Sequence, residues 1–500
     1  MRRLMWVLVG LLLANMSLAA DVRKAVVQVF NQGRDVNFQY PWQNGDIRSG
    51  YGTGVIISGN RILTNAHVID SSLQLQVRKV GSDKKYAAEV AFISDERDLA
   101  LVAVKDPEFF RDTEALELGA LPLLGDEVTT YGFPVGGTQL AITRGVVSRI
   151  DYEVYAHSGY SNLVCQIDAA INPGASGGPA IVNGHLAGLN FQGLPSAAAG
   201  NVGYIIPPPV IESFLKDIED GKVDGVPEIA IVTQTTENPQ LRQRYGLSEQ
   251  DGGALIVSLS GLEKEKGLLK VDDVVVSMDG QSIGNDGTVR FATADRIDSN
   301  ILIARRQIGE HIPLVVIREG KKVNVDYPLT YTLKDSRIIL GHQSNFVPDY
   351  EVLGGLVLVE VNEDLIRTWQ RVPPAVSIER YQYRKTGTAE NDRMLMVVNV
   401  LPDKINLGYE QFLFGIVRSV NHVAVTNLQQ VREQLKNTQG DYVTLGFAPL
   451  DSQVTFSRKA LIESAPLIAE RYGIKPVVEP VSVTPISTPA PTPAPAAATH

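Results

Sequence analysis

Cysteine and long apolar segments are nearly absent from this sequence. Its 500 residues include one cysteine, Cys165, so the chain forms no internal disulfide and its stability must come from packing. Cys165 lies in the apolar stretch 163–167, which favours a buried structural thiol over a nucleophile. After residue 20, no segment is apolar over the roughly 20 residues that a membrane-spanning helix needs.

Positive charge is also scarce. The chain has 46 Lys and Arg residues against 56 Asp and Glu residues, a net charge of -10, which argues against nucleic acid as a partner. Apolar residues make up 44% of the chain and charged residues 20%, the mixture of an ordinary globular protein. Because one hydrophobic core rarely grows beyond about 250–300 residues, the length predicts about three domains.

The first twenty residues differ from the rest. Arg2 and Arg3 precede an apolar run at 4–13, and small residues follow at 17–19, a pattern that predicts a cleavable export signal at 1–20. A membrane anchor is the alternative, but the run is shorter than the roughly 20 residues of a spanning helix. Cleavage leaves 44 basic against 56 acidic residues, no stable membrane span, and a mature protein that is periplasmic or secreted.

Residues 21–225 are predicted to form the first domain, built from β-strands. Short runs rich in β-forming residues alternate with glycines and no helical pattern lies between them, so an antiparallel barrel or sandwich is indicated. These runs lie at 54–57, 62–64, 99–104, 128–132, 146–150 and 184–189. A helix predicted at 208–219 closes the domain, and residues 221–227 form a linker.

Two weakly similar modules follow, at 226–332 and 333–460. The second module has a strand-like run at 253–258 and a strand with a tight turn at 272–280. The third repeats this order loosely, at 354–359 and 414–422, and adds a helical pattern at 428–436. From 461 to 500 the chain is a C-terminal segment that ends in a Pro- and Ala-rich tail, whose composition cannot bury a core and predicts disorder.

Three short segments of the first domain carry residues suited to nucleophilic catalysis. They contain His67, Asp98 and Ser176, in this order and 31 and 78 residues apart. A serine hydroxyl becomes a strong nucleophile only when an imidazole removes its proton, and an aspartate fixes the tautomer of that imidazole. Taken singly, each residue is better explained by an ordinary structural, turn or surface role, but together they predict a catalytic triad.

Glycines surround Ser176. Acyl transfer passes through an oxyanion that converging backbone N–H groups stabilise, and glycines permit the unusual dihedrals that such convergence needs. We therefore predict an oxyanion hole at the amides of Gly174, Ala175 and Ser176. No residue pattern calls for a metal or another cofactor.

The segment 174–178 also matches the G-x-S-x-G nucleophile elbow of α/β-hydrolases. That fold orders its triad Ser, Asp, His and follows the serine with a helix. Here a strand-like run at 180–182 follows Ser176, and none of the later histidines lies in a comparable loop after an acidic residue. An esterase of that fold is therefore disfavoured.

At these residues the chain resembles the HtrA/Deg family of chymotrypsin-fold serine proteases. The matching motifs are TNAHV at 64–68, RDLALV at 97–102 and GASGGP at 174–179, with further likeness at 52–56, 132–134 and 144–148. One departure is Ala175, where most members carry Asn. The resemblance implies a mainly β protein, a chymotrypsin-like double β-barrel followed by two PDZ or PDZ-like α+β modules.

The resemblance also implies candidate binding residues. Leu189, Asn190 and Phe191 align with the strand that lines the specificity pocket, so small or medium aliphatic residues are expected before the scissile bond. In the second module, the loop and edge strand formed by Gly252, Gly253, Ala254, Leu255 and Ile256 are expected to hold a peptide C-terminus, unless that module is only a spacer.

The resulting hypothesis is an ATP-independent serine endopeptidase that degrades unfolded or damaged exported proteins. Its partners are unfolded polypeptides and peptide C-termini, and the resemblance implies a homo-oligomer, a trimer or a multiple of trimers. The alternative is a non-catalytic HtrA-like holdase or scaffold that binds peptides without cutting them.

Overall fold

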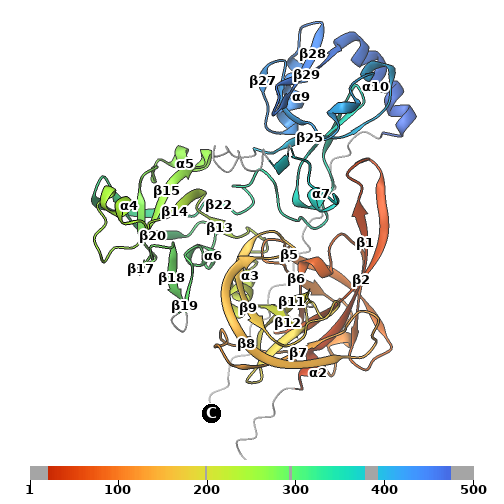
Figure 1. Cartoon of the computed structure of the whole chain (residues 1–500). Coiled ribbons are helices and arrows are strands. Elements are labelled where there is room, and N and C mark those ends of the chain that lie inside the picture. The colour runs from red at the N-terminus through yellow and green to blue at the C-terminus, as the bar shows by residue number, and fades with distance from the viewer. Residues whose placement is uncertain (1–20, 197–199, 292–294, 375, 378–391, 475–500) are drawn as a thin grey trace, which may run out of the picture.

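The computed structural model describes residues 21–196, 200–291, 295–374, 376–377 and 392–474. Within them, three successive modules follow one another, each built mainly from antiparallel strands (Figure 1). The prediction of a mainly β chain that begins with two barrels is confirmed. The predicted signal at 1–20 and the chain beyond residue 474 lie outside the described residues.

The first six strands close into a barrel in the order β1-β2-β3-β6-β5-β4. Aliphatic side chains such as Val27, Ile62 and Val77 fill it and are buried, as expected of β-branched residues on a pleated surface. Its elements are α2 Val22–Ala25, β1 Val26–Val36, β2 Asn44–Ile57, β3 Arg61–Thr64, the 3-10 turn η1 Ala66–Val68, β4 Ser72–Lys79, β5 Lys85–Ser94, β6 Leu99–Ala103 and η2 Pro107–Phe110.

The next six strands close into a second barrel in the order β10-β11-β12-β9-β8-β7. Cys165 is fully buried in its core, and burial raises the pKa of this thiol to about 12, which fits the structural role predicted for it. The strands are β7 Glu127–Gly132, β8 Ala141–Val154, β9 Ser161–Ile167, β10 Pro179–Val182, β11 His185–Ser196 and β12 Gly200–Ile206.

Helix α3, Pro208–Asp217, packs against the second barrel through the buried side chains of Ile211 and Phe214. Its last residue, Asp217, forms an ion pair at 2.8 Å with Arg97, and both side chains are only 1% exposed. Arg97 Nη2 also donates to the carbonyl oxygen of Gly225 at 3.2 Å. One buried guanidinium therefore ties the helix and the linker to the start of β6.

The second module is a sheet in the order β14-β15-β16-β20-β21, with a hairpin of β18 and β19 beside it. Strands β13 and β22 pair where the chain enters and leaves the module. Its elements are β13 Pro227–Glu228, β14 Ile231–Thr235, α4 Pro239–Arg244, β15 Ala254–Leu259, α5 Gly261–Lys266, β16 Val274–Met278, β17 Gln281–Ser282, β18 Thr288–Phe291, β19 Asp295–Asp298, α6 Ile301–Ala304, β20 His311–Arg318, β21 Lys321–Pro328 and β22 Tyr331–Thr332.

The third module is a sheet in the order β23-β24-β25-β26-β28-β29, with β27 paired to β26. The helix predicted at 428–436 is present as α9. Helix α10 was not predicted, and it runs across residue 460, the predicted end of the third module. The elements are β23 Tyr350–Leu353, β24 Leu356–Glu360, α7 Glu363–Arg367, β25 Leu395–Val400, η3 Lys404–Asn406, η4 Glu410–Phe412, β26 Ile416–Val420, β27 Val423–Ala424, α9 Leu428–Asn437, β28 Tyr442–Ala448, β29 Ser452–Ser457 and α10 Arg458–Tyr472.

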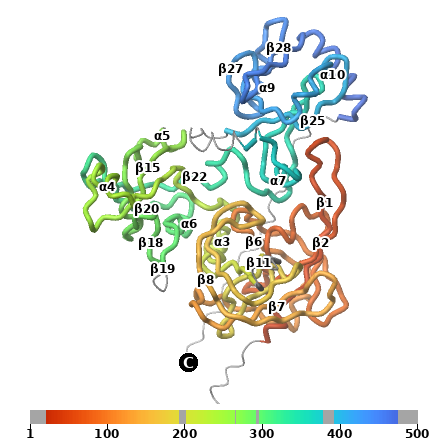
Figure 2. The backbone as a smooth tube through the Cα atoms, in the orientation of Figure 1, coloured from red at the N-terminus to blue at the C-terminus, as the bar shows by residue number. Residues whose placement is uncertain are grey.

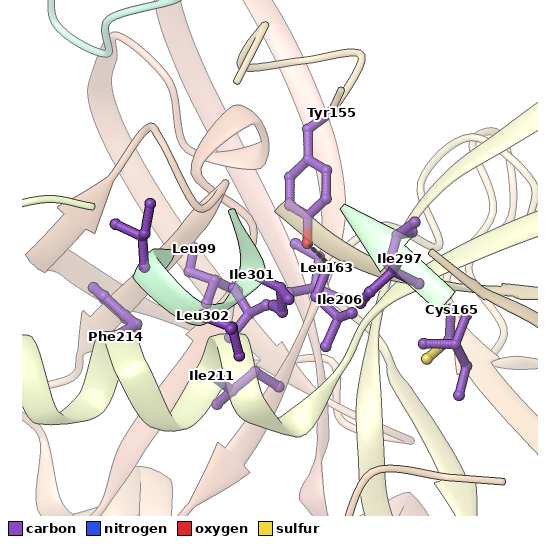
Figure 3. Packing of buried hydrophobic residues seen from close by; sticks show 14 of the residues in the cluster. Leu99, Tyr155, Leu163, Cys165, Ile206, Ile211, Phe214, Ile297, Ile301 and Leu302 are labelled. Carbon is purple, nitrogen blue, oxygen red and sulfur yellow. Dashed lines mark hydrogen bonds between the residues drawn. The ribbon is translucent and has the colours of Figure 1, made fainter. Parts of the chain in front are cut away.

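Both later modules pack against the barrels. Ile301 and Leu302 of α6 join Ile211 and Phe214 of α3 in one buried apolar cluster (Figure 3). The loop between β1 and β2 reaches the third module (Figure 2), where Trp42 Nε1 donates to Tyr472 O at 3.0 Å. No helix in the described residues is long and apolar enough to cross a membrane.

Candidate active site

His67 lies in η1, directly after strand β3. Its Nδ1 lies 2.7 Å from Oδ2 of Asp98, and its backbone N–H donates to Oδ1 of the same carboxylate at 3.0 Å. The side chain of Asn65 donates to the carbonyl oxygen of Asp98 at 3.0 Å. With Nδ1 engaged by the carboxylate, Nε2 is the nitrogen left to accept a proton.

Asp98 lies in the turn between β5 and β6, with a φ of +51°, a region that Asp enters more readily than most residues. Its carboxylate is buried. Burial by itself raises the pKa of the Asp98 carboxyl, but the charge and hydrogen bonds of His67 outweigh it and hold that pKa below its usual range. The carboxylate therefore stays ionised beside the imidazole.

Ser176 lies in the glycine-rich turn between β9 and β10. Thr53 N–H, from the first barrel, donates to Ser176 O at 2.8 Å, and Gly177 N–H donates to Asn190 O of the second barrel at 2.8 Å. The turn is thus fixed to both barrels. The Ser176 hydroxyl donates to Phe191 O at 3.3 Å, and within the described residues no hydrogen bond joins it to His67.

Two glycines of this turn have a left-handed backbone. The φ values of Gly174 and Gly177 are +92° and +80°. A Cβ at Gly177 would lie 2.1 Å from Thr53 O and 2.3 Å from Thr64 Oγ1. Only glycine fits there, and the close approach places the turn against the strand end that leads to His67.

The three amides predicted for the oxyanion hole differ in their bonding. Ala175 N–H donates to Asn172 O at 2.9 Å, so it is engaged inside the turn. Among the described residues, the amides of Gly174 and Ser176 form no hydrogen bond. This conformation therefore leaves two of the three predicted donors free for a ligand oxygen.

Thr53 is a further residue of this site that was not predicted from the sequence. Its hydroxyl donates to Gly174 O at 2.8 Å and accepts from Phe133 N–H at 2.9 Å. Thr53 thereby links the first barrel to the Ser176 turn. Its place between two glycines was the only local signal.

His157 was missed as well. Its ring stacks on that of His67, with centroids 3.7 Å apart and planes inclined by 12°. His157 lies in the loop between β8 and β9, 90 residues from His67 in the sequence. No local pattern marks it.

Leu189, Asn190 and Phe191, predicted to line a specificity pocket, lie on β11 beside the Ser176 turn. The side chains of Leu189 and Phe191 are buried in the apolar core, and Asn190 Nδ2 donates to Tyr131 O at 3.1 Å. Their backbone is engaged as well, since Gly177 N–H donates to Asn190 O at 2.8 Å and Phe191 O accepts from the Ser176 hydroxyl.

The predicted peptide-binding strand of the second module needs correction. Residues 254–256 belong to β15, which pairs with β14 on one side and β16 on the other, so neither edge can accept an added strand. Gly253 packs against β16, where a Cβ would lie 2.7 Å from Val274 Cγ1. The end strand on this side of the sheet is β14.

No group of three or more His, Cys, Asp or Glu side chains that could hold a metal ion occurs in the part of the chain that the structure describes.

Comparison with known proteins identifies families and relatives that this chain resembles. The trypsin-like peptidase domain family matches residues 52–189, and the PDZ domain family matches residues 339–478, in the third module. The mitochondrial Protease Do-like 4 of Arabidopsis thaliana is 38% identical over 82% of this chain and 76% of its own length. The chloroplastic Protease Do-like 2 of the same plant is 31% identical over 93% of this chain and 78% of its own.

Among solved structures, the HtrA-type protease AlgW with a tripeptide aligns with 62% of this chain and 94% of its own, at a TM-score of 0.48 and 25% identity.

Proposed function

The chain belongs to the HtrA/DegP family of serine proteases, and we propose that it is an ATP-independent endopeptidase that cuts unfolded or damaged proteins. His67, Asp98 and Ser176 are its proposed triad. The observation that carries this proposal is the His67–Asp98 contact at 2.7 Å beside a serine turn with two unbonded amides.

In the proposed mechanism, Asp98 holds the Nδ1–H tautomer of His67 and stabilises the imidazolium that forms. The Ser176 hydroxyl now donates to Phe191 O at 3.3 Å, so its side chain must rotate toward Nε2 of His67 before attack. The amides of Gly174 and Ser176 would then receive the oxyanion. Collapse to an acyl-enzyme releases the amine, and water completes the hydrolysis.

The direct test is cleavage of casein, an unfolded protein, by the purified chain without ATP. Ser176→Ala should remove this activity, because the hydroxyl is the only nucleophile in the proposed mechanism, and it should leave casein binding intact. Equal cleavage by both proteins would overturn the triad assignment.

The second candidate is a holdase or scaffold that binds peptides without cutting them. The Ser176 hydroxyl, directed to Phe191 O and not to His67, is the observation that favours it. Casein bound but left uncut by the wild-type chain, at every pH between about 6 and 9, would support the holdase over the protease.

Substrate preference and oligomeric state are also proposed. We propose a preference for small or medium aliphatic residues before the scissile bond, because no acidic side chain that could bind Lys or Arg lies at or beside residues 189–191 in the sequence. Sequencing the ends of casein fragments tests this preference, and cleavage mainly after Lys or Arg would contradict it. A trimer or a multiple of trimers is expected, and light scattering of the purified chain would measure its mass.

Export is proposed from the charged and apolar pattern of residues 1–20. The named relatives are mitochondrial and chloroplastic proteins, so import into an organelle is the alternative to a periplasmic or secreted location. Sequencing the N-terminus of the mature protein and fractionating the cell that makes it would separate the two. A mature chain that still carries residues 1–20 would contradict cleavage.

A further inference from the structure

The loop between β8 and β9, residues 155–160, is a tight turn that presents His157. Tyr155 and Tyr160 are buried at its two ends. Tyr155 N–H donates to Tyr160 O at 2.8 Å, and Gly159 N–H donates to Tyr155 O at 2.8 Å. The turn is therefore held at its base, and the His157 ring is placed by this loop together with a hydrogen bond to the backbone of Phe191.

The third module binds four consecutive carbonyl oxygens of this loop. Arg367, at the end of α7, donates from Nη2 to Ala156 O at 3.0 Å and from Nη1 to His157 O at 2.9 Å. His342 N–H donates to the carbonyl oxygen of residue 158 at 3.1 Å. Arg337 Nη1 donates to that of residue 159 at 2.7 Å. The third module thus fixes the backbone that carries His157.

His157 is neutral at pH 7 in this setting. Burial, and after it the neighbouring His67, lower its pKa to about 4, and the opposing effect of Asp98 is smaller. A neutral ring lying 3.7 Å over His67 presents its π face to the imidazolium that His67 becomes during catalysis, which is a favourable cation–π arrangement. The same contact restricts rotation of the His67 ring.

We propose that His157 is a positioning residue for the catalytic imidazole of His67, and that the third module sets its place through Arg367. This inference rests on the proposed function, since it assigns a role within the same site. Contact with substrate is not part of the role: His157 acts through His67.

A small probe separates this role from a role in substrate binding. Diisopropyl fluorophosphate transfers its diisopropylphosphoryl group to a serine that an imidazole activates, with release of fluoride, and it does not fill an extended peptide site. His157→Ala should slow both probe labelling of Ser176 and peptide hydrolysis, the latter in kcat more than in KM, by about fivefold. His157→Phe keeps a flat neutral ring and should remain within about twofold of wild type.

The role of Arg367 is tested by a double-mutant cycle. Arg367→Met should slow labelling about as much as His157→Ala, and the double variant should be no slower than His157→Ala alone. Arg471→Met is the matched control, because Arg471 pairs with Asp403 at 2.7 Å inside the same module, and its labelling should equal wild type.

Two results would overturn the inference: His157→Ala labelled at the wild-type rate, or His157→Phe as slow as His157→Ala. A wild-type chain that takes up no more probe than Ser176→Ala would instead contradict the proposed function.

Discussion

At the scale of single residues, Gly177 and Gly184 form a natural pair of probes. Their φ values are +80° and +81°, so alanine is strained equally at both, but a Cβ at Gly177 would lie 2.1 Å from Thr53 O, whereas none of the atoms around Gly184 lies within 4 Å of its Cβ. Each substitution should cost about 1 kcal/mol through its dihedral.

Only Gly177→Ala should also displace the Ser176 amide, lowering casein hydrolysis about 100-fold, the usual effect of losing one oxyanion donor. Thermal melting and steady-state hydrolysis of both variants measure the two effects separately. Equal activity of the two variants would show that crowding at Gly177 does not hold the turn in its functional shape.

Some residues of the candidate site are marked by a short sequence motif, and others are not. His67, Asp98 and Ser176 could be singled out because each lies in a short distinctive segment, and the order of the three carries information. Thr53 and His157 could not, since their importance depends on which distant strands and loops meet. The hydrogen bond of the Ala175 amide could not be predicted from the sequence either, because it depends on the detailed shape of one turn.

At the scale of elements, the second module offers a test of peptide capture at β14. Thr233 and Gln234 pair with Ile256 and Leu255 of β15, and successive N–H groups of a strand point to opposite sides. One of the two therefore bonds to β15 and the other faces the open edge. Proline has no backbone N–H, so a proline at either position removes one hydrogen-bond donor from β14.

If a peptide C-terminus adds to β14, one of Thr233→Pro and Gln234→Pro should lower peptide affinity while keeping the melting temperature. The other should lower the melting temperature, because it breaks the β14–β15 ladder. Fluorescence anisotropy with a labelled apolar peptide, and with its C-terminal amide as control, measures binding. Two variants with wild-type affinity would identify the module as a spacer.

The prediction that residues 254–256 form the peptide-binding edge strand was wrong for a simple structural reason. The Gly–Gly pair at 252–253 was interpreted as part of a ligand-binding loop, but Gly253 packs against β16. The pair at 354–355 forms a turn. Gly354 and Gly355, with φ values of +58° and +89°, form the two-residue turn between β23 and β24, as a tight hairpin requires. Strand periodicity predicted β24 and β15 correctly, but it carries no information on which strand lies at an edge.

At the scale of the whole molecule, the joints between modules were the least predictable feature. The sequence indicates three modules, but not that one cluster joins α3 to α6 (Figure 3). Nor does it indicate that residues 337–344 lie along the barrels, where Ser344 donates to Asp95 at 2.6 Å. Such contacts depend on the shapes of complete domains and leave no periodic pattern in the chain.

One of these joints should respond to pH. His342, of the third module, lies with Nδ1 3.0 Å from Asp364 and Nε2 3.6 Å from Asp70 of the first barrel. Burial lowers the pKa of His342, but the hydrogen bond and charge of Asp364, with the charges of Asp70 and Asp95, outweigh it and raise the pKa to about 9. The folded chain therefore holds this proton more tightly than the unfolded chain.

Because the folded pKa lies above the unfolded value of 6.5, the stabilisation is complete below pH 6.5 and is lost as the pH rises through 9. It amounts to at most about 3 kcal/mol. Wild type should therefore lose more thermal stability between pH 6 and 9.5 than His342→Gln does. The control His311→Gln removes an exposed His–Asp pair and should follow wild type. Parallel losses in wild type and His342→Gln would mean that the joint of the third module does not depend on this proton.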